Sequence, residues 1–196
     1  MPTRDEAWDL VCEWTESDSL RKHMLAVETA VRAYARRFGE DEEKWAVAAL
    51  VHDLDYERYP DPADGHPRHA VEELRSRGYP EDVIHAVLSH AEYMGVPRDA
   101  LLDRALFACD ELSGFITACA YVRPAGIEGL TTKSVKKKLK QPSFAAGVNR
   151  DDVRVGAEEL EGDSGLSFDE HVQFVIDALA ERADELGLGP REPAAS

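Results

Sequence analysis

A histidine and an aspartate, His52 and Asp53, stand side by side after the apolar run 45–51. A neutral imidazole and a carboxylate are both ligands for divalent metal ions. At the edge between a buried helix and a loop, the two side chains can face a cavity. Most His-Asp pairs in proteins are surface neighbours without a role, so this pair matters only if other histidines and carboxylates converge on it.

Four further residues occur where successive helices could direct them toward the pair. His23 lies next to the apolar stripe of its helix, and His66 begins the helix after a loop rich in proline and glycine. His90 shares the inward face of its own helix. Asp110 lies in an otherwise apolar helix, where an isolated buried carboxylate is costly and a metal ion is one way to offset that cost.

Each of these residues has a simpler interpretation when it is taken alone. A single histidine on an inner helix face is more often a hydrogen-bonded core residue than a ligand, and Asp110 could pair with Arg123. Three other histidines receive no ligand role. His85 points about 140° away from the inward histidine of the same helix, His69 falls on an exposed turn, and His171 opens an amphipathic helix and is expected to be solvated. The metal-site hypothesis therefore depends on the joint pattern.

The elements that would position these residues are all helices. Apolar residues recur with a period near 3.6 and alternating patterns are absent, so we predict an all-α fold. Capping residues and glycines indicate the helix ends. The predicted helices cover residues 4–14, 20–38, 41–52, 67–77, 81–93, 99–121, 131–140, 151–160 and 168–186.

The length of 196 residues predicts one domain with a real core. We place this single domain at 1–187, with a helical-bundle core at about 18–124. A short C-terminal helical extension at about 131–187 caps it, with a flexible link at 162–165. Residues 188–196 are expected to form a flexible tail.

The amino-acid composition limits the classes of binding partner and indicates the cellular compartment. Asp and Glu number 39 against 23 Lys and Arg, a net charge of −16, so we expect no nucleic acid polymer and no membrane as partner. A small phosphorylated molecule remains compatible, because a bound metal inverts the local charge. No signal peptide and no transmembrane run are visible. Three cysteines without a CxxC spacing favour a reducing cytoplasm.

A basic run and two acids have two interpretations each. Four of the seven lysines crowd into residues 136–140. They could bind a phosphate or a nucleotide tail, or form a solvated helix face that balances the acidic C-terminal helices. The candidate substrate-binding residues are Lys136, Lys137, Lys140 and Arg150, with Arg123 as an alternative. Asp55 and Glu111 could orient ligands or move protons, or be exposed surface acids.

The joint pattern resembles the HD superfamily of metal-dependent phosphohydrolases, whose signature is a histidine, an adjacent His-Asp pair and a distal aspartate. These positions are matched by His23, His52, Asp53 and Asp110. The two-metal branch of the family adds two histidines between the pair and the distal aspartate, and these are matched by His66 and His90. The resemblance covers roughly residues 18–124.

The resemblance implies a binuclear site with Asp53 as the bridge. One ion would be held by His23, His52 and Asp110, and the other by His66 and His90. With Asp53 and His52 at the catalytic centre, one or two divalent ions (Mn, Fe, Co, Ni or Mg) would activate a water. The water would attack a small phosphorylated substrate, a nucleotide or another phosphoester, which makes the protein a phosphoric ester hydrolase.

Two other functions stay open at this point. Oxygenases of the myo-inositol oxygenase type belong to the same superfamily and use a very similar six-ligand set around two irons. A non-enzymatic module that binds a nucleotide is the other alternative. The hydrolase ranks first because most of the family hydrolyses phosphoesters and because the lysine run suits an anionic ligand.

Overall fold

The computed structural model describes residues 1–191 of the chain. Among these residues the regular secondary structure consists of helices, without a strand, which confirms the predicted all-α fold. No helix in this part of the chain has both the length and the apolar composition needed to cross a membrane.

Contacts within the chain divide it into two compact units, residues 1–107 and residues from 108 onward. The first contains α1 (Arg4–Trp14), α2 (Asp18–Phe38), α3 (Glu42–Val51), α4 (Arg68–Ser76), α5 (Glu81–His90) and the 3-10 helix η1 (Glu92–Met94). The second contains α7 (Thr132–Leu139), α8 (Arg150–Ser164), α9 (Phe168–Glu181) and α10 (Ala183–Leu186). The boundary lies inside α6 (Leu101–Tyr121). The expectation of one domain with a core at about 18–124 stays a prediction.

Local side-chain chemistry sets the ends of the first three helices. Thr3 and Glu6 form a capping box at the start of α1. The side chain of Ser17 caps α2, and Gly39 ends this helix in the left-handed conformation, with φ of 73°. Asp41 accepts the backbone N–H groups of the first turn of α3. Helix α3 begins after its cap Asp41 and ends directly before the His-Asp pair.

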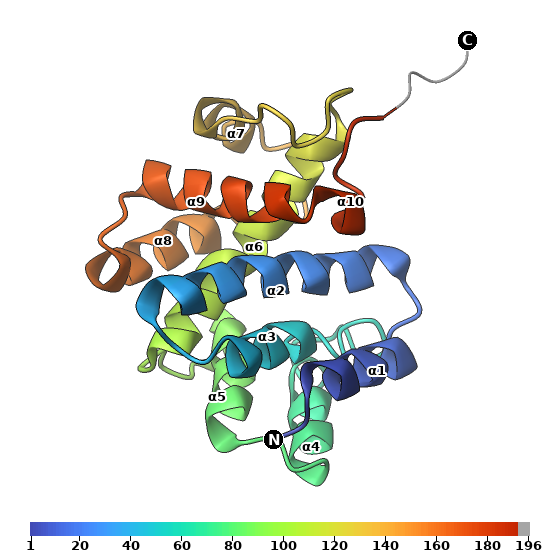
Figure 1. Ribbon diagram of the computed structural model, residues 1–196. Coiled ribbons are helices and arrows are strands. Elements are labelled where there is room, and N and C mark those ends of the chain that lie inside the picture. The colour runs from blue at the N-terminus through green and yellow to red at the C-terminus, as the bar shows by residue number, and fades with distance from the viewer. Residues whose placement is uncertain (192–196) are drawn as a thin grey trace. The chain divides into compact units, whose positions relative to one another are not determined.

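The helix α3 is the centre of the first unit (Figure 1). All residues from 45 to 51 are buried, Trp45 included, because this stretch is apolar on every side. It contacts α2, α1 and α5, and α5 in turn contacts α4. A helix packed on several sides holds its last residues in a defined place.

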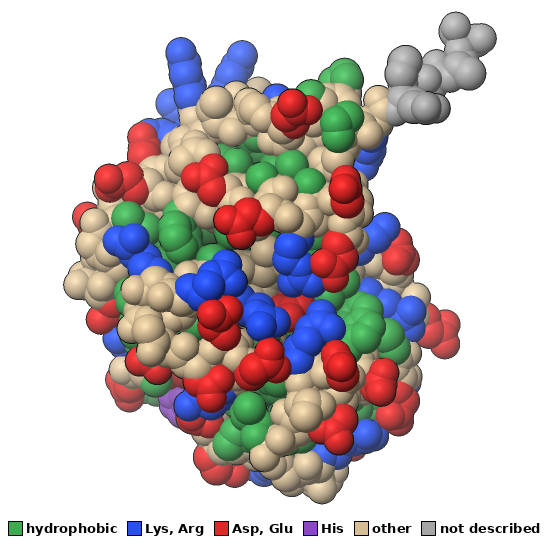
Figure 2. All heavy atoms as spheres, in the orientation of Figure 1, with side chains coloured by type: hydrophobic (Ala, Val, Ile, Leu, Met, Phe, Trp, Pro, Cys, Tyr) green, Lys and Arg blue, Asp and Glu red, His purple; other side chains and the backbone are tan. Residues whose placement is uncertain are grey.

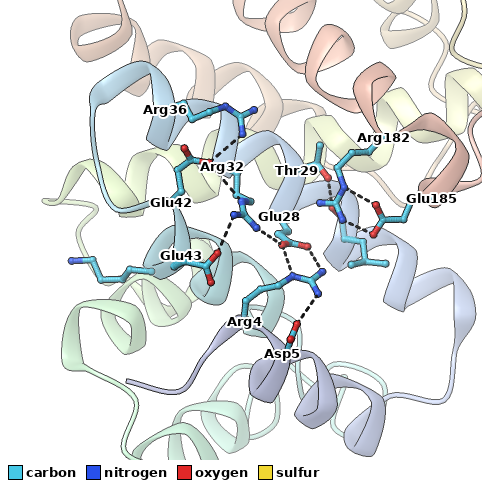
Figure 3. Close-up of polar contacts among 12 residues, drawn as sticks. Arg4, Asp5, Glu28, Thr29, Arg32, Arg36, Glu42, Glu43, Arg182 and Glu185 are labelled. Atoms are coloured by element: carbon cyan, nitrogen blue, oxygen red, sulfur yellow. Dashed lines mark hydrogen bonds and ion pairs between the residues drawn. The ribbon is translucent and has the colours of Figure 1, made fainter.

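A buried ion pair joins the helices around α3 (Figure 3). The side chain of Glu28 on α2 is 0 % exposed, and Arg4 of α1 donates to both of its oxygens, at 2.8 and 2.9 Å. Arg32 lies 3.4 Å from Glu28 and 3.1 Å from Glu43 at the start of α3. A buried carboxylate without such partners would be strongly destabilising. The pair therefore ties α1, α2 and α3 together by charge as well as by apolar packing.

The helix α9 is the centre of the second unit. It contacts α7, α8 and α10, and its inner face buries Val172, Val175, Ile176 and Leu179.

On the visible face of the molecule, acidic and basic side chains are interspersed (Figure 2). Neither sign of charge forms a continuous field there.

Two C-terminal boundaries differ from the sequence-based expectation. The helix α8 continues to Ser164 and ends at Gly165, through the stretch that we expected to be a flexible link. We expected the tail to begin at residue 188, yet Leu188 is buried and its carbonyl accepts the N–H of Ile127 at 2.8 Å. Residues 192–196 of the expected tail lie outside the described residues.

The expectation that His171 is solvated is wrong. This residue is 2 % exposed, and its Nε2–H donates to the carbonyl of Ala108 at 3.1 Å. It lies four residues before Val175 on the buried face of α9, so helical periodicity carries it inward. Burial lowers the pKa of His171 to about 4.

We expect the buried His171 to make the stability of the protein depend on pH. In the unfolded chain the imidazole titrates near pH 6.5, whereas in the folded protein it stays neutral down to about pH 4. As pH falls through this window, the unfolded state gains a proton that the folded state does not. The free energy of unfolding should therefore decrease, by up to about 3 kcal/mol.

Urea unfolding of the wild type and of His171→Gln between pH 7 and pH 4 checks this expectation. Glutamine can still donate to the carbonyl of Ala108 but does not titrate in this window. The variant should lose less stability on acidification than the wild type does. Equal losses in both proteins would contradict the assigned role of His171.

Candidate metal centre

The pair His52 and Asp53 follows directly after α3. His52 is the C-cap residue of this helix and is fully buried. Its Nδ1–H donates to the carbonyl of Ala49 at 2.7 Å. This hydrogen bond assigns the ring proton to Nδ1, so Nε2 is the nitrogen that can bind a metal ion.

The carboxylate of Asp53 is surrounded by the Nε2 atoms of four histidines. Its Oδ2 lies 3.5 Å from Nε2 of His52 and 3.6 Å from Nε2 of His23. Its Oδ1 lies 3.4 Å from Nε2 of His66 and 3.7 Å from Nε2 of His90. Each carboxylate oxygen therefore faces one pair of imidazoles.

A closed loop places His66 beside this carboxylate. The N–H of Gly65 donates to the carbonyl of Asp61 at 2.8 Å, and the N–H of His66 donates to that of Tyr59 at 2.7 Å. A Cβ atom on Gly65 would overlap both of these carbonyl oxygens, so this position accepts only glycine. The loop rich in proline and glycine is thus a rigid support for the histidine that follows it.

A second carboxylate holds the other side of the His66 ring. Asp55 is fully buried, and its Oδ1 accepts from Nδ1–H of His66 at 2.7 Å. Its Oδ2 accepts from the backbone N–H of Ala70 in the first turn of α4, at 2.8 Å. The complete burial of Asp55 excludes the interpretation as an exposed surface acid.

The Nε2 atoms of His66 and His90 lie 3.1 Å apart. The Nδ1–H of His90 donates to the carbonyl of Val87 at 2.5 Å, and that of His66 donates to Asp55. With both ring protons on Nδ1, two lone pairs face each other, which is repulsive unless a proton or a metal ion lies between them. Two imidazole nitrogens bound at right angles to one ion, each at about 2.1 Å, are about 3 Å apart.

The residues of the first unit therefore fit a metal ion. Imidazole nitrogens and a shared carboxylate form a donor set suited to divalent transition metals. The ligand atoms of His52, Asp53 and His90 all lie within 4.8 Å of one another. His23 stands at the more open side of the cluster, with its side chain 23 % exposed and its ring 5.4 Å from that of His52.

Asp110 and Glu111 lie on the part of α6 that belongs to the second unit. Asp110 is partly buried, as is Glu111. The role of Asp110 as the distal ligand stays a prediction, as does any role of Glu111.

The lysine run lies on α7 in the second unit. Lys136, Lys137 and Lys140 line an open cavity of about 570 Å³ together with Thr132 and Asp169. Lys136 forms an ion pair with Asp169 at 2.7 Å. This cavity is large enough for a small anion, and lysine side chains border it.

Arg150 has a different environment from the lysines. Its guanidinium donates to four backbone carbonyls of the loop 141–148, including those of Ala145 and Val148 at 3.1 and 2.6 Å. These hydrogen bonds favour a structural role that fixes the loop. A contact of Arg150 with substrate stays a prediction.

The histidines that were given no ligand role in the first unit have other partners. The ring of His69 stacks on that of Tyr59, with centroids 4.0 Å apart. Nδ1 of His85 lies 3.0 Å from Oδ2 of the buried Asp103. Both histidines thus have contacts that do not involve Asp53.

Sequence analysis missed the tyrosines around His66. Tyr93 donates its hydroxyl to the carbonyl of His66 at 2.9 Å, and the ring of Tyr56 lies edge-on to the imidazole of His66 at 5.3 Å. Partial burial raises the pKa of Tyr93 to about 12, and the charges of Asp53 and Asp55 add to the rise, so the hydroxyl remains a donor at neutral pH. The position of Tyr56, three residues after Asp53, was the available signal.

Comparison with known proteins adds one match. The family model of the HD domain matches residues 20–114 of the chain, a stretch that contains all six predicted metal ligands. No curated protein and no solved structure matches the chain.

Proposed function

Because the chain belongs to the HD superfamily, most of whose members are metal-dependent hydrolases, we propose that it is a phosphohydrolase of small phosphorylated molecules. The observation that carries the proposal is the Asp53 carboxylate, whose two oxygens each face a pair of histidine Nε2 atoms at 3.4–3.7 Å. Such a set suits two divalent ions rather than one. Asp53 and His52 are at the centre of the proposed catalytic site.

The proposed ligand sets follow the two oxygens of Asp53. His23 and His52, with Asp110, would hold one ion, and His66 and His90 the other. Divalent ions held there would supply an acidified water as nucleophile and would neutralise charge on a phosphoester. The protein's own part is to hold His52, His66 and His90 in one tautomer through hydrogen bonds from Nδ1, so that the Nε2 atoms of these three imidazoles remain available.

Exposed tyrosines support a nucleotide as the substrate. Tyr56, Tyr59 and Tyr93 are three of the five large apolar side chains that are exposed in the described part of the chain. All three contact the segment from His66 to His69. An exposed tyrosine ring is a stacking surface for a nucleobase. A nucleotide with its phosphate at the ions could place its base on these rings.

The lysine cavity supports an anionic substrate. We propose that Lys136, Lys137 and Lys140 bind a phosphate group of the substrate, because these three lysines and Lys133 border one cavity in an otherwise acidic chain. The protein would act in a reducing cytoplasm, in line with its three unpaired cysteines.

Reconstitution with metals tests the proposal. The purified chain, stripped with a chelator, should release almost no phosphate. Addition of Mn, Co, Ni, Fe or Mg should restore phosphate release from nucleotides at least a hundredfold. Sugar phosphates without a base should react more slowly if the tyrosines contact the base.

Two outcomes would contradict the proposal. Oxygen consumption with iron alone, and no phosphate release with any metal, would identify an oxygenase. Tight nucleotide binding without any product would identify a binding module.

A further inference from the structure

We propose that Asp55 is a positioning residue that sets the metal affinity of one ion position, that of His66 and His90. The inference rests on the proposed function only in that this position binds a divalent ion. Asp55 would act through its hydrogen bond to His66 and would not touch the ion.

The hydrogen bond to His66 differs in kind from those of the neighbouring ligands. His52 and His90 donate from Nδ1 to neutral backbone carbonyls. His66 donates to a carboxylate, at 2.7 Å. Among these three imidazoles, His66 is the one whose Nδ1–H donates to a group with a formal charge.

A carboxylate partner changes a histidine ligand in two ways. It attracts the proton on Nδ1, which raises the basicity of Nε2 and strengthens its bond to a metal ion. It also fixes the ring orientation, provided that the carboxylate itself cannot turn. The second oxygen of Asp55 accepts from the N–H of Ala70 at 2.8 Å, so the carboxylate is held at both ends. Its complete burial strengthens both interactions.

The first unit contains a matched control for this arrangement. Asp103 is also a fully buried carboxylate, and its Oδ2 lies 3.0 Å from Nδ1 of His85. The same oxygen accepts from the backbone N–H of Ala100 at 2.9 Å. His85 is not a predicted ligand. Asp103→Asn thus removes the same kind of buried charge without acting on a ligand of the proposed centre.

The experiment is a titration of the full chain, stripped of metal, with Mn²⁺ alone, in which electron paramagnetic resonance counts the free ion. The wild type should bind two ions. In Asp55→Asn, one ion should bind about 10 to 100 times more weakly, which is the usual effect of losing such a partner. The other ion should bind within twofold of the wild type, and Asp103→Asn should match the wild type at both.

A double-mutant cycle shows whether Asp55 acts through His66. His66→Ala should weaken the same ion as Asp55→Asn, and adding Asp55→Asn to His66→Ala should cause no further loss. Equal weakening of both ions, no weakening of either, or additive losses in the double variant would each overturn the proposal.

One measurement on the wild type keeps the proposal testable if Asp55→Asn fails to fold. Nitrogen-15 NMR of the histidine rings should find His66 protonated at Nδ1 in the metal-free protein. The opposite tautomer would overturn the inference.

The two proposals fail in different ways. Absence of phosphate release together with the predicted affinity pattern would contradict the phosphohydrolase and leave the role of Asp55 standing. Phosphate release with unchanged Mn²⁺ binding in Asp55→Asn would support the phosphohydrolase and contradict the role of Asp55. A wild type that binds no Mn²⁺ would contradict both.

Discussion

Asp53→Ala should abolish phosphate release and remove both metal ions. The two oxygens of Asp53 face two different pairs of histidines, at 3.4–3.7 Å, so this single side chain would serve both ion positions. Loss of metal catalysis removes several kcal/mol of transition-state stabilisation. The expected fall in kcat is therefore at least about a thousandfold. His52→Ala should also lower both kcat and the metal content.

Metal analysis and a phosphate-release assay on the same preparations check this result. Asp64→Ala is the control, because Asp64 is exposed and lies in the loop just before His66. The control should keep two ions and the wild-type rate. Because the side chain of Asp53 is only 13 % exposed, circular dichroism of Asp53→Ala checks that the variant folds. If Asp53→Ala and His52→Ala together left turnover and metal content intact, the assigned centre would be wrong.

The second large effect is expected from Asp110→Ala. The resemblance to HD proteins assigns Asp110 to the ion that His23 and His52 also bind. The variant should retain one Mn²⁺ of two, at the position of His66 and His90. The value of kcat should fall at least about a hundredfold, because one of the two ions that stabilise the charge of the reacting phosphate would be lost.

Manganese stoichiometry and kcat separate this prediction from simple destabilisation. Asp103→Asn serves again as the control, since Asp103 lies on the same helix α6, two turns earlier. Thermal unfolding of both variants without metal should give similar midpoints. Two bound ions and an unchanged rate in Asp110→Ala would show that Asp110 is no ligand and that the first unit alone carries the site.

Much of the fold follows from rules that act within four residues along the chain. Thr3, Ser17 and Asp41 cap the helices that the sequence predicts to start there, and Gly39 ends α2. The apolar run before His52 predicts a buried central helix, and α3 is one. Where the local signal was weak the boundaries moved, as in α8, which continues past Gly162 to Ser164.

The candidate ligands were identified from residue type and order, which needs no knowledge of distance. Five of the six candidate ligands lie on or beside helices of the first unit: His23, His52, Asp53, His66 and His90. Residue order cannot say which histidine faces which oxygen of Asp53. It also cannot separate a buried Asp55 from an exposed acid, because both have the same neighbours in the chain.

The sequence by itself therefore determined the all-α class, most helix ends and the set of chemically competent side chains. Tertiary structure alone decided which partners these side chains contact. It paired Asp55 with His66, placed the ring of His171 in the core and directed the guanidinium of Arg150 to backbone carbonyls. The physical reason is range. Caps and periodicity involve residues within one helical turn, whereas the partners of a buried charge or imidazole can be tens of residues away and meet only when the helices pack.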